Sequence, residues 1–207
     1  HHFLNNMICE RVGNEVEKLY ADYAKQYNGG SFTALSESLV SDLRSKKARK
    51  EEFVSNFTTL SYAPDSIGLI CYIFDRINND LYKAKGGQRV KVFYPDQSVQ
   101  KKNYNIEHLL SQKVKKEQNT DKDLIEAIDN IGNLLVISRH TNSKIGSLSP
   151  SEKIKLFQEN QVFLNNLPYL NDFIDKYKDS FKKWSTKEIN ERANHLANDV
   201  FDKIWNF

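Results

Sequence analysis

The chain has 207 residues, of which 28% are charged and 39% hydrophobic, with a formal net charge of +3. The length suits one large domain or two small ones. With so small a net charge, the electric field of the whole molecule attracts nucleic acid only weakly. The lack of a long apolar run predicts a protein without a membrane span. Cys9 and Cys71 lack the spacing of metal ligands. We expect both to be reduced, buried thiols of a cytoplasmic protein.

The first hundred residues are predicted to be mainly helical. Apolar residues recur every three or four positions over residues 3–26, 32–43 and 50–57. Residues 66–82 are apolar on most sides, which predicts a buried central helix. A strand is expected at Val90–Tyr94, after Gly86-Gly87. We expect residues 1–100 to form an N-terminal helical bundle packed on a core at 101–148, within one compact domain overall.

The polar residues of greatest interest lie in 101–148. A strand-like run leads into Glu107-His108, and a second apolar strand, Leu134–Ile137, follows later in the chain. We expect the two strands to pair antiparallel, with a short helix at Arg139–Ile145 folding back across them. Because side chains alternate along a strand, Glu107 and His108 reach one site only if the strand ends there.

These residues have the chemistry of a phosphodiester hydrolase. A carboxylate oxygen from Glu107 and an amide oxygen from Asn142 suit a hard divalent cation, which keeps several waters and takes few protein ligands. The imidazole of His108 titrates near neutral pH and suits a general base. Each residue also has an ordinary structural interpretation. Glu107-His108 could be a solvated surface pair, Gly132-Asn133 a turn, and Asn142 a helix cap.

The order of these residues resembles that of the HNH, or ββα-metal, nucleases. More closely, Ile106-Glu107-His108-Leu109-Leu110-Ser111-Gln112 is similar to the hallmark Ile-Glu-His-Ile-Leu-Pro-Gln of the C-terminal nuclease domain in GmrSD-type modification-dependent restriction enzymes. Ile131-Gly132-Asn133-Leu134 and Asn142-Ser143-Lys144 continue the pattern. Ser111 stands where that family usually has proline, which puts the loop geometry in question more than the chemistry.

The resemblance implies a role for each matched residue. Glu107 and Asn142 are expected to bind Mg²⁺ or Mn²⁺. His108 is expected to take a proton from the attacking water, and Asn133 to orient the imidazole by accepting its second N–H. The implied activity is a divalent-metal-dependent DNA endonuclease that nicks or cuts, as the effector of a bacterial modification-dependent restriction or phage-defence system.

Basic residues near this motif are candidates for contact with DNA phosphates. They are Lys113, Lys115, Lys116 and Lys144. Lys101 and Lys102 precede the motif. We expect residues 149–207 to form a C-terminal helical cap with capping boxes at Ser149–Glu152 and Ser185–Glu188. In the last helix, Arg192 could reach a phosphate or form a structural ion pair.

The sequence therefore predicts an α+β fold, mainly α, in which a helical domain holds an embedded ββα-metal core. Its predicted partner is DNA. No Gly-rich phosphate loop is present. If the intact protein couples cleavage to nucleotide hydrolysis, the nucleotide-using or modification-sensing domain or subunit that the resemblance implies lies outside this chain. Two alternatives remain open: a catalytically inactive nucleic-acid-binding module, and a helical protein–protein interaction domain.

Overall fold

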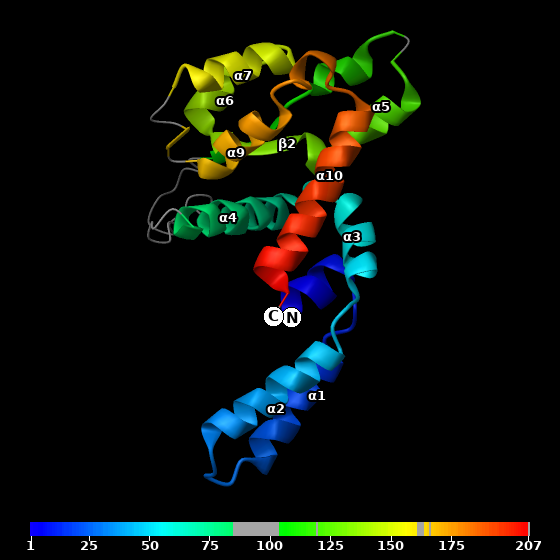
Figure 1. Cartoon of the computed structure of the whole chain (residues 1–207). Coiled ribbons are helices and arrows are strands. Elements are labelled where there is room, and N and C mark those ends of the chain that lie inside the picture. Colours follow the sequence, from blue (N-terminus) through cyan, green and yellow to red (C-terminus); the bar gives the residue numbers. More distant parts are fainter. Residues whose placement is uncertain (85–103, 119, 161–163, 166, 207) are drawn as a thin grey trace. The chain divides into compact units, whose positions relative to one another are not determined.

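The computed structural model describes residues 1–84, 104–118, 120–160, 164–165 and 167–206 (Figure 1). The described residues are mainly helical and include a small antiparallel sheet of two strands. This confirms the predicted α+β, mainly α class. The strand expected at Val90–Tyr94 and the pair Lys101-Lys102 lie outside the described residues. The chain divides into two compact units, residues 1–57 with 197–207 and residues 58–196.

The first unit joins the two ends of the chain. Its elements are η1 (Phe3–Ile8), α1 (Asn14–Gln26), α2 (Phe32–Ser45), α3 (Lys50–Thr58) and η5 (Phe201–Trp205). The helix predicted over residues 3–26 is broken between η1 and α1, where Glu10 has a φ of 50°. The core of the unit is aromatic: Phe3 stacks on Trp205 with ring centroids 4.1 Å apart, and Phe53 packs against Phe201.

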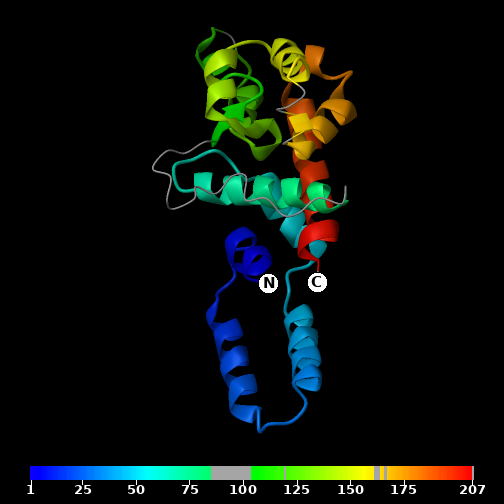
Figure 2. The ribbon, with the colours of Figure 1, turned by 90° about the vertical axis from the view of Figure 1, so that its left-hand side faces the viewer.

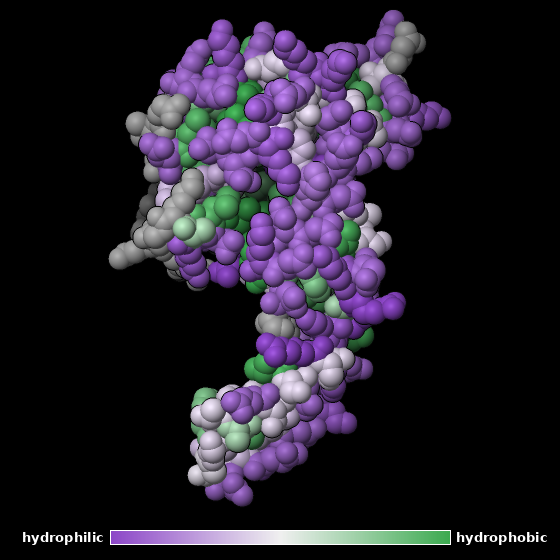
Figure 3. All heavy atoms as spheres, viewed as in Figure 1, coloured by the Kyte–Doolittle hydropathy of each residue, from purple (hydrophilic) through white to green (hydrophobic). Residues whose placement is uncertain are grey.

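Helices α1 and α2 form a hairpin (Figure 2). Gly29 in the connecting turn has a φ of 86°, a conformation that glycine adopts without strain. No residue of α1 is buried. Figure 3 shows apolar and weakly polar residues along the hairpin surface, and Phe32 is 71% exposed.

The second unit contains the sheet. Strand β1 (Tyr104–His108) pairs antiparallel with β2 (Leu134–Ser138), so that Glu107 is opposite Leu135 and His108 opposite Leu134. Helix α6 (Arg139–Ile145) follows β2 directly and contacts both strands. The predicted strand–strand–helix arrangement is therefore present. It brings the motif at 104–112 next to the one at 131–138, although the two are far apart in the sequence.

Helices surround this sheet (Figure 1). They are α4 (Ile67–Ala84), α5 (Lys122–Ala127), α7 (Pro150–Gln158), α9 (Pro168–Tyr177), α10 (Thr186–Val200) and the short η2 (Gln112–Lys116), η3 (Ile131–Asn133) and η4 (Phe181–Lys183). Helix α4 packs against α9 and β2. On α9, the Tyr169 hydroxyl donates to the Val136 carbonyl at 2.6 Å and accepts from the Val136 N–H at 2.9 Å. This side chain satisfies backbone groups of β2 that a third strand would otherwise pair.

Local signals set the helix boundaries correctly at several points. The capping box predicted at Ser149–Glu152 is present, with Pro150 as the first residue of α7. Cys9 and Cys71 form no disulfide with any described residue, and both are half-buried, whereas the sequence predicted buried thiols. Among the described residues, no helix is both long enough and apolar enough to cross a bilayer.

Candidate active site

Glu107 and His108 end β1 and point to opposite faces of the sheet, because successive side chains of a strand alternate. Both are buried, with 9% and 8% of their surface exposed. Their partners differ accordingly: the Glu107 carboxylate contacts Lys153 of α7, and the His108 imidazole contacts Asp129 after α5. The end of β1 therefore connects two separate groups of polar side chains.

The His108 group is a hydrogen-bond network centred on Asp129. His108 Nε2 lies 3.1 Å from Asp129 Oδ1, and Gln112 Nε2 donates to the same oxygen at 2.8 Å. The Lys115 ammonium binds the other carboxylate oxygen of Asp129. The Tyr62 ring packs edge-on against the imidazole with centroids 5.0 Å apart. All rotamers in this group are thus held by at least one neighbour.

The protonation state of the pair follows from its surroundings. Burial lowers the pKa of His108 to about 4, against the opposing effect of the Asp129 charge. Burial alone would raise the pKa of Asp129, but hydrogen bonds from Lys115 and Gln112 outweigh it and hold that pKa below its usual value. At neutral pH a neutral imidazole therefore faces a carboxylate. Since the carboxylate can only accept, Nε2 carries the proton and Nδ1 is the basic nitrogen.

The Glu107 group is a buried ion pair. Lys153 Nζ lies 2.5 Å from Glu107 Oε1 and donates to the His108 carbonyl at 2.7 Å, and its side chain is 0% exposed. Burial raises the pKa of Glu107 above its ordinary value, and the hydrogen bond and charge of Lys153 offset only part of this rise. Within the described residues, the second oxygen of Glu107 accepts no hydrogen bond.

Asn133 organises the loop after β1 and does not contact the imidazole. Its amide oxygen accepts from the Leu110 N–H at 2.9 Å and from Trp184 Nε1 at 3.1 Å. Its amide nitrogen donates to the carbonyls of Leu110 and Ile128. Asn133 was predicted to accept the second N–H of His108, but the structure shows a different arrangement. Asp129 accepts that N–H, and the Asn133 amide is fully occupied by the hydrogen bonds described above.

Asn142 lies on α6, half-buried, and its side-chain amide makes no hydrogen bond to any described residue.

The lysines predicted to contact DNA differ in their exposure and in whether their ammonium groups bind neighbouring side chains. Lys116 and Lys144 are exposed, and Lys113 is exposed while donating to Ser147 Oγ at 2.8 Å. Lys115, in contrast, is half-buried in the ion pair with Asp129.

Arg192 is an interior residue that fixes α10 to the start of β2. It is 2% exposed and donates to the carbonyls of Gly132 and Leu134 at 2.7 and 2.8 Å. Its guanidinium also lies 4.2 Å from the centroid of the Phe173 ring. Burial lowers the pKa of Arg192 to about 10, so the side chain stays charged at neutral pH. The predicted phosphate contact does not fit this position, because the guanidinium is buried against the backbone.

Few side chains near β1 could act as ligands for a metal ion. The described residues contain no cluster of three or more His, Cys, Asp or Glu side chains that could enclose a metal ion. A cation held here would take at most one or two side-chain oxygens and would complete its shell with water or phosphate oxygens, as Mg²⁺ commonly does.

Residues 47–199, about three-quarters of the chain, match the family model described as GmrSD restriction endonucleases, C-terminal domain. The chain belongs to this family. No match was found among curated proteins or among solved structures. Membership of this GmrSD family implies nuclease activity, and a nuclease domain implies a DNA substrate. The matched region contains β1, β2, α6 and the residues that bind Glu107 and His108.

Sequence reasoning missed three residues that this GmrSD domain brings to the site: Asp129, Gln112 and Lys153. Gln112 belongs to the hallmark motif, and its contact with Asp129 explains why an amide suits that position. Lys153 could have been noticed as a lysine on the buried face of α7, beside Ile154 and Phe157. Asp129 carries no local signal, since an acidic residue after a short helix is common.

Proposed function

We propose that this domain is an HNH-type, divalent-metal-dependent DNA endonuclease with His108 as its general base. The observation that carries the proposal is the neutral imidazole at the end of β1, held through Nε2 by Asp129. Family membership supports nuclease activity, and the antiparallel pair followed by α6 supports the ββα type.

The reaction uses His108 Nδ1 to accept a proton from a water molecule. The oxygen of that water attacks the scissile phosphorus, and the bond from phosphorus to the leaving deoxyribose oxygen breaks. The leaving oxygen takes its proton from solvent. An imidazole whose pKa is about 4 is a weak base, but DNA phosphates close to it favour the imidazolium and raise its pKa towards the operating pH. Asp129 stabilises the imidazolium that forms.

A divalent cation, Mg²⁺ or Mn²⁺, would be held by the free oxygen of Glu107 and the amide oxygen of Asn142. Both are oxygen donors without another hydrogen-bond partner among the described residues, which fits a hard cation. When bound, the cation polarises the phosphate and stabilises charge on the leaving oxygen. Since Lys153 already binds one oxygen of Glu107, tight metal binding would require further oxygen donors from water and the DNA phosphate.

Contacts with DNA are proposed for Lys113, Lys116 and Lys144, which are exposed on η2 and α6. Lysine–phosphate contacts are blind to sequence. Target choice, including the recognition of modified DNA, is therefore assigned to a nucleotide-using or modification-sensing domain or subunit outside this chain. In this scheme the domain is the effector of a cytoplasmic restriction or phage-defence system.

The test is incubation of the protein with supercoiled plasmid and Mg²⁺ or Mn²⁺, with and without chelator. We expect nicked or linear product only with metal, and none from His108→Ala. His195→Gln is the matched control, because His195 is exposed on α10 and its hydrogen bond to Tyr177 can be kept by glutamine. Equal cleavage by wild type and His108→Ala would reject His108 as the base.

A further inference from the structure

A lysine on the inward face of a helix is costly to bury unless its charge is paired. Helix α7 buries Lys153 together with Ile154 and Phe157, and the Lys153 side chain has no exposed surface. Both of its hydrogen bonds go to consecutive residues of β1: one to the Glu107 carboxylate and one to the His108 carbonyl. The second hydrogen bond links the ammonium directly to the main chain of His108.

The second hydrogen bond acts on the peptide group between His108 and Leu109. The carbonyl of this peptide accepts from Lys153 at 2.7 Å, and its N–H donates to the Asn133 carbonyl at 2.9 Å. The peptide plane is therefore held from both sides at the point where the chain leaves the strand. Because this plane fixes the backbone of His108, it also fixes the direction in which the imidazole leaves the main chain.

We propose that Lys153 is a positioning residue for the nuclease site. It holds the His108–Leu109 peptide and one oxygen of Glu107, so that the imidazole and the carboxylate keep their places at the end of β1. The proposal rests on the nuclease function proposed above. Lys153 touches neither DNA nor the attacking water in this scheme. It acts through the main chain of His108 and through the carboxylate of Glu107.

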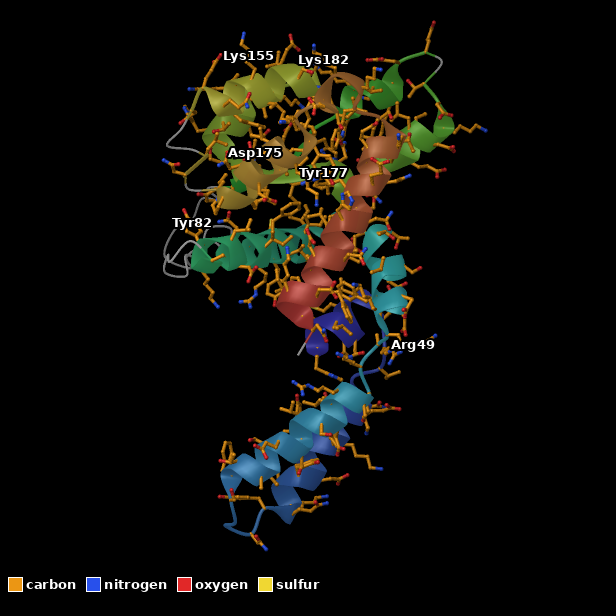
Figure 4. The ribbon with its side chains drawn as sticks, viewed as in Figure 1. Arg49, Tyr82, Lys155, Asp175, Tyr177 and Lys182 are labelled. Atoms are coloured by element: carbon orange, nitrogen blue, oxygen red, sulfur yellow. The ribbon has the colours of Figure 1, made fainter. Side chains whose placement is uncertain are left out.

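The test compares Lys153→Met, which keeps the length of the stem and removes the ammonium, with Lys155→Met. Lys155, labelled in Figure 4, lies two residues further along α7 and is exposed, so it controls for the loss of one lysine from the same helix. We expect kcat of Lys153→Met to fall about 10–100-fold, as for other residues that orient a catalytic group. KM for DNA should change less than about 3-fold, because the exposed lysines are untouched. Lys155→Met should keep the wild-type kcat.

Amide hydrogen exchange separates positioning from general loss of stability, and it needs no activity. In Lys153→Met the Leu109 amide should exchange at least about 10-fold faster than in wild type, whereas the Ile73 amide in the buried helix α4 should keep its rate. Equal acceleration at both amides, or wild-type kcat in a folded Lys153→Met protein, would overturn the positioning role.

If Lys153→Met does not fold, Lys153→Gln replaces it, because glutamine keeps one donor without the charge. The same comparisons then apply with Lys155→Gln as the control. The two proposals fail separately. A wild-type protein that never cleaves DNA overturns the nuclease function and with it the catalytic part of the Lys153 role. A wild-type protein that cleaves, together with unchanged kcat in the Lys153 variant, overturns the Lys153 role alone.

Discussion

Gly132 lies so close to α10 that no side chain fits between them: a Cβ on Gly132 would meet the Ile189 carbonyl oxygen at 2.0 Å. The Gly132 carbonyl in turn accepts from Arg192 on the same helix. Direct contact between the backbone at the start of β2 and the backbone of α10 sets where β2 begins. It thereby also sets the position of Leu134, which is opposite His108 in the sheet.

Gly132→Ala should therefore destabilise the protein by at least about 2 kcal/mol, because the new methyl group meets backbone atoms that cannot rotate away. Chemical denaturation followed by circular dichroism measures this change. Gly68→Ala is the control: a Cβ at Gly68 in α4 meets nothing within 4 Å, so alanine should be neutral or slightly stabilising there. Equal stability of both variants would contradict the close approach at Gly132.

The sheet and most helices could be predicted from the sequence because their signals are local. The position of β2 follows from an apolar run, and the start of α7 follows from the Ser149–Glu152 capping box. The break between η1 and α1 was missed because the apolar spacing continues across it, whereas the positive φ of Glu10 depends on the packing of the unit.

The site was harder to predict than the fold. Sequence alone predicted that His108, Glu107 and Asn142 share one site, and it assigned the orientation of the imidazole to Asn133. Asn133 and Asp129 are only four residues apart, and which of them faces His108 depends on the geometry of the loop before β2. For Arg192 the sequence left open a phosphate contact or a structural ion pair, because a helical stripe does not reveal whether the end of a long polar side chain is buried.

Asp129→Asn should lower kcat about 10²–10⁴-fold, the usual range for loss of general-base function. An amide at this position can donate to Nε2, which would move the imidazole proton to Nδ1 and remove the lone pair that accepts the proton of water. Single-turnover cleavage at saturating DNA measures the effect. Glu126→Gln, an exposed acid-to-amide change on α5, should retain activity. An active Asp129→Asn protein would show that His108 needs no carboxylate partner.

The stability of the metal-free protein should fall as the pH is lowered from about 6.5 to 4. The pKa of His108 is about 4 in the folded chain, below the ordinary value of 6.5 in the unfolded chain. Between these values the unfolded chain binds more protons, so acid favours unfolding, with a total of about 3 kcal/mol over the window. Urea denaturation with chelator at several pH values should show this loss in wild type. The His108→Gln variant should lack this contribution to the pH dependence of stability. The same slope of unfolding free energy against pH in both proteins would contradict a buried neutral imidazole.

Binding to DNA should depend on salt through the exposed lysines near the site. Replacing Lys113, Lys116 and Lys144 together by alanine should weaken binding to unrelated duplexes to a similar extent, because phosphate contacts carry no sequence information. Each lost contact should reduce the slope of log K against log salt by about 0.9. Fluorescence anisotropy with several duplexes across a salt series measures the affinity and its salt slope. Ca²⁺ is present in place of Mg²⁺ to limit cleavage.

The charge-matched control for this experiment replaces Lys18, Lys25 and Lys46, three exposed lysines that precede the region matched by the family model. The loss of three positive charges lowers the general electrostatic attraction to DNA equally in both triple variants. Any difference in their salt slopes therefore comes from local contacts with DNA. We expect the control to keep most of the wild-type salt slope. Equal slopes for the two triple variants would remove η2 and α6 from the DNA-binding surface, and a strong preference for one duplex would show that the domain itself reads bases.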